Sequence, residues 1–161
     1  MSFLVLVVGP RKAGKDTIVS GARVQLRGDP AFRFLRSADQ LFSIPLERDL
    51  AAGRIVVATV SPAAIPRARA FHSPVAVVSI SAPEDTLAWR RAAEGDVGLE
   101  RYGAGTGLPA VIFRGGPDEY VVDNGSRPDI AIRQFVRILK RLAARKELID
   151  GGALALPSSA A

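Results

Sequence analysis

The feature that most constrains the fold is the stretch at residues 9–17, which reads GPRKAGKDT. The spacing GxxxxGK needs glycine where the backbone turns tightly against phosphate oxygens, and a lysine that reaches the terminal phosphates. Gly9, Gly14 and Lys15 fit this spacing. The apolar run 3–8 precedes the stretch and a helical pattern follows it, so main-chain N–H groups and a helix dipole converge on one anion. We therefore predict a phosphate-binding loop in preference to an ordinary strand-to-helix turn.

The residue after the lysine departs from the usual pattern of such loops. Serine or threonine is common there as a magnesium ligand, whereas this chain has Asp16 followed by Thr17. A carboxylate can hold magnesium, but it also brings negative charge toward the phosphates of a nucleotide. Asp16 and Thr17 are both candidate metal ligands at this stage.

Length and composition favour one soluble domain. A chain of 161 residues, 48% of them hydrophobic, is long enough to bury a core. It has no cysteine, so it offers neither a disulfide nor a thiolate metal site, and its single histidine, His72, argues against a catalytic triad or a zinc cluster. The apolar run 3–8 is too short for a signal peptide or a membrane span. We expect a cytoplasmic protein with no membrane partner.

The net charge of +6 raises the question of a nucleic-acid partner. Arginines are spread along the chain and aromatic residues make up only 6%, so no basic stretch is interleaved with stacking rings. A small phosphate-rich substrate explains the excess of arginine equally well. The last helical pattern has a basic outer face made of Arg133, Arg137, Lys140, Arg141 and Arg145. For that face a solvated surface is favoured over nucleic-acid binding, and no nucleic acid is expected.

Strand and helix patterns alternate along the chain. Strands are expected at residues 3–8, 31–35, 54–60, 75–80 and 120–122, and helices at 16–27, 44–52, 62–71, 84–94 and 130–148. We expect Trp89 to pack in the interior, residues 95–116 to be a mobile glycine-rich segment, and 1–150 to form one domain before a disordered tail at 151–161. Alternation predicts a three-layer α/β fold with a five-stranded, mostly parallel sheet, the P-loop NTPase fold. In such sheets ligands bind beyond the carboxyl ends of the strands, where the loop falls.

Five stretches, in this order, carry a resemblance to a known family. They are GPRKAGKDT with a helix ending in RGDPAF, IPLERDLAAGRIVVATVS, SISAPEDTLAWR and YVVDNGS. The chain resembles the ribose 1,5-bisphosphate phosphokinases of phosphonate catabolism, which are relatives of guanylate kinase and share the Lys-Asp-Thr ending of the loop. The resemblance extends over nearly the whole chain except residues 36–42 and the tail. It implies transfer of the terminal phosphoryl group of ATP to ribose 1,5-bisphosphate, giving phosphoribosyl diphosphate and ADP.

The resemblance also implies a role for particular residues. ATP phosphates would be held by the loop residues Gly9, Pro10, Arg11, Lys12, Ala13, Gly14, Lys15, Asp16 and Thr17. Asp16 or Thr17 would face Mg²⁺, and Lys15 would bridge the terminal phosphates. Arg90 and Arg101 would be lid arginines that close over them, and the turn containing Asp123 and Asn124 would lie beside the adenine.

The chain departs from the family pattern between its second and third strands. Relatives insert a small acceptor-binding subdomain there, whereas residues 36–53 of this chain leave room for little more than one short helix. Thr59, Pro62 and Glu94 stand where relatives have asparagine, arginine and a further lid arginine. Within the loop, Arg11 and Lys12 replace the usual serine and glycine.

Two functions of different classes therefore stay open. One is a working kinase for a small phosphorylated sugar, and the other is a non-catalytic member of the same family that binds a nucleotide or a partner. A homodimer in which a second copy completes the shortened region is also possible. Asp39, Glu47 and Asp49 in that region could line an acceptor site, although surface charges are the favoured interpretation.

Overall fold

Five parallel strands form a single sheet at the centre of the protein. The computed structural model describes residues 2–72, 74–93 and 118–152. Across the sheet the strand order is β2 (Phe32–Phe34), β3 (Ile55–Thr59), β1 (Phe3–Val8), β4 (Val75–Ser81) and β5 (Glu119–Asp123), and every neighbouring pair is parallel. Every residue of β1 is buried, as expected for a strand covered on both faces. This confirms the predicted parallel α/β sheet.

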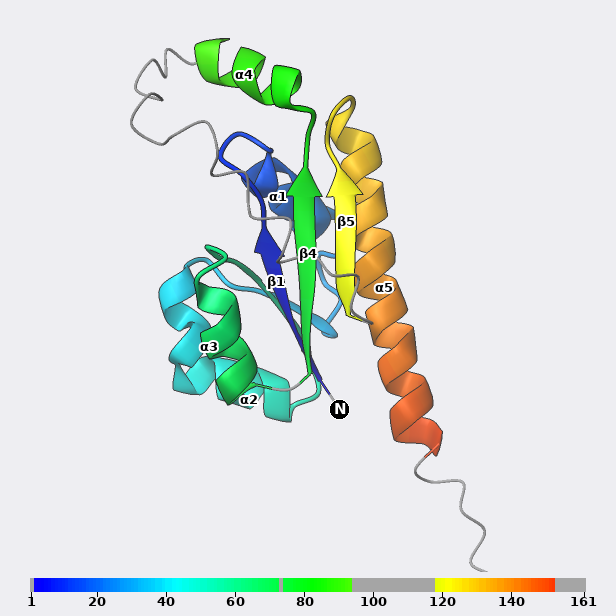
Figure 1. The fold of residues 1–161 in the computed structure, drawn as a ribbon. Helices are drawn as coiled ribbons and strands as arrows, with labels where there is room; N and C mark the ends of the chain where they lie inside the picture. The colour runs from blue at the N-terminus through cyan, green and yellow to red at the C-terminus, as the bar shows by residue number, and fades with distance from the viewer. Residues whose placement is uncertain (1, 73, 94–117, 153–161) are drawn as a thin grey trace, which may run out of the picture.

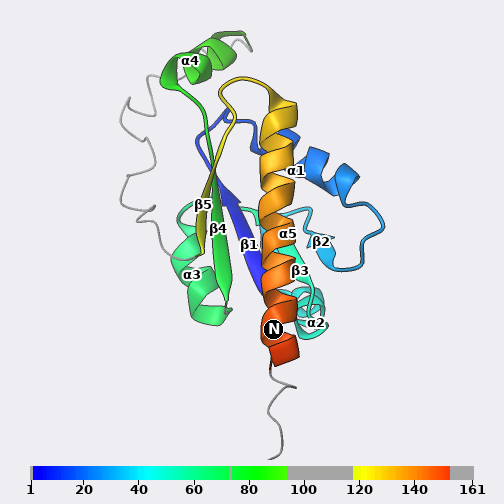
Figure 2. The same ribbon diagram turned by 90° about the vertical axis from the view of Figure 1, so that its right-hand side faces the viewer.

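Helices cover both faces of the sheet (Figure 1). The helices are α1 (Lys15–Gln25), the 3₁₀ helix η1 (Ala38–Phe42), α2 (Ile44–Ala51), α3 (Ala64–Phe71), α4 (Glu84–Ala93) and α5 (Pro128–Gly152). Figures 1 and 2 show α1 and α5 together on one face and α2 and α3 on the other, with α4 beyond the carboxyl end of β4. The three predicted layers are therefore present, and α4 lies over the edge where ligands of such sheets bind.

Two apolar clusters fill the spaces between the layers. Alternate residues of β1 point to opposite faces: Phe3, Val5 and Val7 pack with α1 and α5, whereas Leu4, Leu6 and Val8 pack with η1, α2 and α3. Helix α5 contributes Phe135, Leu139 and Leu142, which are buried, and Ile138, which is partly buried, to the first of these clusters. No helix in the described ranges is both long and apolar enough to cross a membrane.

The connection between β2 and β3 contains more structure than predicted. Residues 38–42 form η1 in addition to the one short helix expected between residues 36 and 53. Ser37 caps η1, since the Asp39 main-chain N–H donates to Ser37 Oγ at 3.3 Å. Leu41 of η1 and Leu46 of α2 are almost completely buried against the sheet. The region between β2 and β3 thus covers the apolar cluster on one face of the sheet.

Three other expectations concern Trp89, the end of the last helix and two segments predicted to lack regular structure. Trp89 is 71% exposed on α4, so the prediction that it packs in the interior is wrong. Helix α5 continues through Gly152, two residues past the boundary predicted at residue 150. The whole segment predicted to be mobile, together with residues 153–161 of the predicted tail, lies outside the described residues.

Candidate functional site

The amino terminus of α1 is open to a ligand. Its N-cap residue is Gly14, with φ of 86°, and no side chain caps the helix. The first N–H groups of a helix have no carbonyl partner within it, so those of Lys15, Asp16 and Thr17 are available to an anion. Glycine is required at the cap, because a Cβ there would lie 2.3 Å from Asn124 Nδ2. The sequence pattern and the local packing therefore demand the same residue.

The opposite end of the loop is fixed by the sheet. Gly9 follows β1 directly, and a Cβ at this position would lie 2.4 Å from the main-chain oxygen of Ile80 in β4. Within the loop the N–H of Ala13 donates to the Pro10 oxygen at 3.2 Å. The two glycines of the motif are thus needed for close approach of the loop to β4 and to the turn after β5.

The side chain of Lys15 folds back onto the first residues of the loop. Its Nζ donates to the main-chain oxygens of Gly9 at 2.7 Å and Pro10 at 3.0 Å. Burial of the ammonium lowers the pKa of Lys15 below its ordinary value, and the neighbouring Asp16 carboxylate opposes this by stabilising the charged form. A positive charge is therefore held at the end of the loop where residues 9 and 10 lie.

Arg90 joins three elements around the loop. Its guanidinium donates to the main-chain oxygen of Lys12 at 3.2 Å and to that of Asn124 at 2.8 Å. It thereby links α4 to the loop and to the turn after β5. Arg91 instead donates to the carboxylate of Glu84 at 3.2 Å.

Asn124 is a buried polar residue between the loop and the sheet. It is 2% exposed, and its Nδ2 donates to the main-chain oxygen of Ala13 at 2.8 Å. Its own N–H donates to the Ser81 oxygen at 2.7 Å, which continues the pairing of β5 with β4. Its Oδ1 has no hydrogen-bond partner within the described ranges. Asn124 therefore joins the loop to the end of β4 through its two hydrogen bonds.

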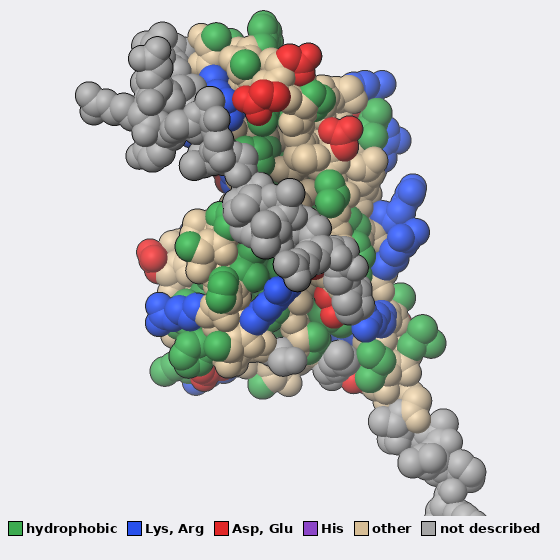
Figure 3. All heavy atoms as spheres, viewed as in Figure 1, with side chains coloured by type: hydrophobic (Ala, Val, Ile, Leu, Met, Phe, Trp, Pro, Cys, Tyr) green, Lys and Arg blue, Asp and Glu red, His purple; other side chains and the backbone are tan. Residues whose placement is uncertain are grey.

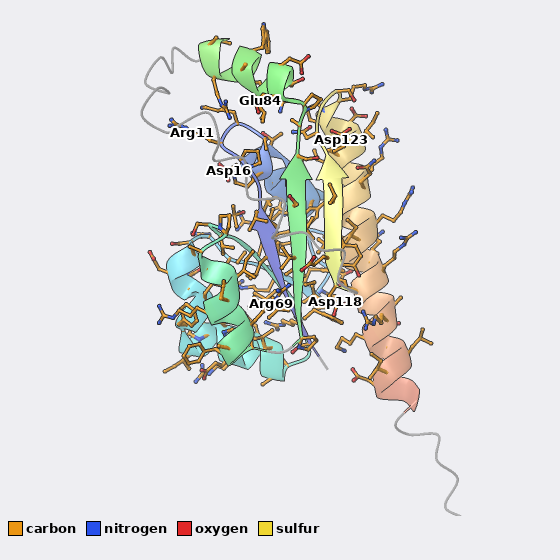
Figure 4. All side chains as sticks on the ribbon, in the orientation of Figure 1. Arg11, Asp16, Arg69, Glu84, Asp118 and Asp123 are labelled. Carbon is orange, nitrogen blue, oxygen red and sulfur yellow. The ribbon has the colours of Figure 1, made fainter. Side chains whose placement is uncertain are left out.

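A cavity of about 510 Å³ opens at this place. It is lined by Arg11, Lys12, Gly14, Lys15, Asp16 and Thr17 of the loop and first turn, together with Arg90, Asn124 and Pro128. Figure 4 shows Arg11 and Asp16 on the same side of the loop, below α4. Six of these nine residues belong to the loop motif and the other three come from distant parts of the sequence, so segments far apart in the chain meet at one hollow.

The remaining predicted site residues lie elsewhere. Gly9, Pro10 and Ala13 shape the loop without lining the cavity. The carboxylate of Asp123 is exposed and accepts from the Gly125 N–H at 2.8 Å. Arg101 lies outside the described residues. Sequence reasoning missed Pro128, the first residue of α5, although proline at a helix start was a recognisable signal.

The cavity offers oxygen ligands suited to magnesium. Mg²⁺ is commonly held by one or two protein oxygens together with substrate phosphates, and the Asp16 carboxylate and Thr17 hydroxyl line the cavity. The third strand ends on Thr59 and supplies no carboxylate there. No cluster of three or more potential metal ligands exists among the described histidine, aspartate and glutamate residues. The residues present thus fit a metal shared with a nucleotide.

Two solved structures with a similar fold are a sugar kinase and a gluconokinase. A sugar kinase from Janibacter superposes with a TM-score of 0.58 at 16% identity, over 91% of this chain and 98% of that one. A gluconokinase from Sinorhizobium meliloti superposes with a TM-score of 0.52 at 17% identity, over 88% and 93%. At this identity the likeness concerns the fold. The parallel sheet with its phosphate-binding loop is the architecture of P-loop kinases.

Sequence relatives define the family within that class. The ribose 1,5-bisphosphate phosphokinase PhnN of Methylobacterium radiotolerans is 33% identical over 160 aligned positions, which cover 72% of this chain and 91% of the relative. The protein of the same name from Brucella melitensis is 28% identical over 88% of this chain and 93% of its own length. No family model matches the chain. The chain belongs to the PhnN family of ribose 1,5-bisphosphate phosphokinases.

Proposed function

We propose that the chain transfers the terminal phosphoryl group of ATP to the 1-phosphate of ribose 1,5-bisphosphate. The reaction forms a bond between an oxygen of the 1-phosphate and the terminal phosphorus, and it breaks the bond from that phosphorus to the oxygen that stays with ADP. The products are phosphoribosyl diphosphate and ADP. The observation that carries the proposal is the cavity where Lys15, Arg90 and the open amino terminus of α1 meet.

Phosphoryl transfer asks a protein mainly for positioning and for neutralisation of charge on the phosphate oxygens. In the proposed complex, N–H groups of the loop and of the first turn of α1 hold the nucleotide phosphates. Lys15 exchanges its bonds to the Gly9 and Pro10 oxygens for the terminal phosphates. Asp16 and Thr17 are the proposed magnesium ligands, and the metal supplies further neutralisation of phosphate charge.

Arg90 is the proposed lid residue of this site. Its guanidinium lies on the cavity wall and is held by two main-chain oxygens. Because a phosphate oxygen accepts a stronger, charge-assisted bond than a carbonyl does, we expect Arg90 to turn toward the terminal phosphate when the nucleotide binds. Arg101 is proposed to act with it, on the basis of the family resemblance alone.

The test is an assay of ADP release by the purified protein with magnesium and ATP. We expect ADP release to depend on added ribose 1,5-bisphosphate and to fall by at least about a hundredfold in Lys15→Ala, since a charged phosphate contact is lost. Arg137→Ala on the exposed face of α5 is the matched control and should retain full activity. Absence of any acceptor-dependent ADP release in the wild-type protein would rule out the proposed reaction.

A second candidate is a nucleotide-binding protein that performs no transfer. It is favoured by two observations: β3 ends without a carboxylate, and the residues between β2 and β3 cover the core. Both candidates predict that MgATP binds and that Lys15→Ala weakens the binding. Calorimetric binding of MgATP without acceptor-dependent turnover would select the second candidate.

Nucleic-acid binding through α5 has less support. Figure 3 shows lysine and arginine side chains along the right-hand edge of the view, where Figure 1 draws α5. Several of these charges are paired, as in Arg133 with Asp129 at 3.1 Å and Arg145 with Asp118 at 2.6 Å. Because these charges are paired within the protein, we favour a kinase that acts on a small molecule over a nucleic-acid-binding protein. We propose that it works in the cytoplasm, where ATP is supplied.

A further inference from the structure

The side chain of Asn124 holds a carbonyl group of the phosphate loop. Asn124 follows β5, and its Nδ2 donates to the main-chain oxygen of Ala13 at 2.8 Å, across 111 positions of sequence. A carbonyl oxygen only accepts hydrogen bonds, so the amide nitrogen of Asn124 is the atom that faces the loop. Ala13 is completely buried, and a buried carbonyl is unfavourable unless a donor reaches it. Asn124 supplies that donor.

The loop has an unusual backbone at the point where Asn124 holds it. Lys12 and Gly14, on either side of Ala13, have positive φ angles of 68° and 86°. Turns with such left-handed residues direct successive N–H groups toward one side and form concavities that bind anions. A residue with a side chain, such as Lys12, is less stable in this region than glycine, so its surroundings have to fix the conformation. Two donors do so here, since Arg90 bonds to the Lys12 oxygen at 3.2 Å and Asn124 bonds to the Ala13 oxygen.

Asn124 is itself attached firmly to the sheet. Its N–H donates to the Ser81 oxygen at 2.7 Å, and its main-chain oxygen accepts from Arg90 at 2.8 Å. The amide also packs against the N-cap of α1, because a Cβ on Gly14 would lie 2.3 Å from Nδ2. Figure 1 shows the turn after β5 at the same end of the sheet as the loop. A side chain fixed in this way can hold two successive loop residues in place relative to the sheet.

We propose that Asn124 is a positioning residue for the triphosphate chain of the nucleotide. Its bond to the Ala13 oxygen keeps that negatively polarised atom engaged within the protein, so that N–H groups of the loop, and not its carbonyls, face the phosphates. A loop that is already in this conformation binds an anion without the loss of affinity that ordering the loop would bring. The inference rests on the proposed function, because it assumes that a nucleoside triphosphate binds in the loop.

A contact with the base is the competing role for Asn124. The family resemblance places the turn after β5 beside the adenine, and Asn124 lines the cavity. The two roles differ in how the effect of Asn124 depends on the ligand. An effect through the loop is the same for every ligand with a triphosphate chain, whereas an effect through the base requires the adenine. Inorganic tripolyphosphate has the chain without the base and therefore distinguishes the two roles.

The test measures the Kd of MgATP and of magnesium tripolyphosphate by calorimetry. We expect Asn124→Ala to raise the Kd of both ligands by the same factor, about tenfold, because one buried hydrogen bond that holds the loop is lost. Val122→Ala, which removes buried apolar atoms of β5 away from the cavity, should lower the melting temperature but change either Kd by less than about twofold. A rise for MgATP alone would assign Asn124 to the base and overturn the inference, as would no rise for either ligand or an equal rise in Val122→Ala.

A second variant keeps the inference testable if Asn124→Ala does not fold. Asn124→Ser retains a polar group, but its side chain ends one bond short of the nitrogen that reaches Ala13. It should therefore weaken both ligands by a common factor. Binding of both ligands as tight as in the wild-type protein would contradict a role at the loop.

The result can be separated from the fate of the proposed reaction. Wild-type protein that binds both ligands but transfers no phosphoryl group still permits the comparison, whereas wild-type protein that binds neither ligand overturns the inference and the proposed function together. Where transfer occurs, Asn124→Ala should raise the KM for MgATP about tenfold and leave the KM for ribose 1,5-bisphosphate unchanged. An equal rise in both Michaelis constants would indicate a general loss of structure and contradict the positioning role.

Discussion

Individual residues of the loop are fixed by contacts that the motif alone does not reveal. Gly9 and Gly14 match the pattern GxxxxGK and both have a positive φ, yet their neighbours differ: Gly9 approaches the main chain of β4, and Gly14 lies against Asn124. The glycine requirement is therefore both conformational and steric at Gly14. Its two components can be measured separately, because the chain contains a second glycine of the same φ in open space.

Gly14→Ala should destabilise the protein more than Gly28→Ala. Both glycines have φ of 86°, but a Cβ at Gly14 would lie 2.3 Å from Asn124 Nδ2, whereas nothing lies within 4 Å of one at Gly28. We expect a loss of about 1 kcal/mol for Gly28→Ala from backbone strain and about 2 to 4 kcal/mol for Gly14→Ala, where overpacking is added. Urea denaturation measures both. Equal losses of unfolding free energy in the two variants would show that the loop accommodates the added methyl group without a steric cost.

The lowered pKa of Lys15 predicts how nucleotide affinity depends on pH. Burial makes Lys15 lose its proton at a lower pH than an exposed lysine does, and the neutral amine no longer attracts phosphate. Above a pH of about 8 the nucleotide phosphates are already fully ionised, so affinity for MgATP should fall as pH rises through the lowered pKa of Lys15. Calorimetry at a series of pH values tests this. Lys15→Met should bind weakly, with little pH dependence, and a similar decline in that variant would point to another group.

Pairs of elements determine where the loop lies. Helix α1, which begins at the loop, lies beside α5 (Figure 2), and both helices contribute to the same apolar cluster. A Cβ at Gly21 of α1 would lie 2.4 Å from Cδ1 of Ile132 in α5. The close approach of these two helices thus depends on one glycine facing one isoleucine.

Exchanging the sizes of this pair should restore stability that a single change removes. Gly21→Leu forces the helices apart and should cost about 2 kcal/mol, since overpacking a filled contact strains side chains and backbone. Combining it with Ile132→Ala returns most of the lost volume, so the double variant should recover at least about half of that loss. Thermal or urea unfolding of the two single variants and the double variant measures the coupling. Additive losses would contradict direct contact between these positions.

At the scale of the whole molecule, the site exists only where three segments meet. The loop after β1, Arg90 of α4 and Asn124 after β5 are separated by long stretches of sequence and are joined by hydrogen bonds between 2.8 and 3.2 Å. A ligand binds at this junction only when the chain is folded, because unfolding separates the three segments. Its binding free energy therefore adds to the stability of the fold.

MgATP should raise the thermal stability of the whole domain. At a nucleotide concentration one hundred times Kd, the free energy of unfolding should increase by about 2.7 kcal/mol. Differential scanning fluorimetry with and without MgATP tests this, and Lys15→Ala is expected to show a much smaller shift. A wild-type melting temperature that is insensitive to saturating nucleotide would remove the basis for a nucleotide site.

The local sequence determined the strands, the loop and most of the helices. The apolar run of β1, the glycine spacing of the loop and the helical pattern of α5 follow from periodicity and backbone sterics, which act over a few residues. The same rules predicted one parallel sheet and the edge at which its site lies. They missed η1, whose formation depends on the Ser37 cap and on burial of Leu41, and they wrongly assigned Trp89 to the interior.

The family resemblance assigned Arg90 and Asn124 to the site, but only the tertiary structure decided how they contact the loop. Nothing near Arg90 in the sequence indicates that it bonds to the oxygens of Lys12 and Asn124, and Asn124 gives no sign of its bond to Ala13. Such contacts join residues up to 111 positions apart, because parallel strands bring their carboxyl ends together whatever their separation along the chain. The sequence by itself determined the phosphate-binding loop, and packing of the sheet decided the cavity around it.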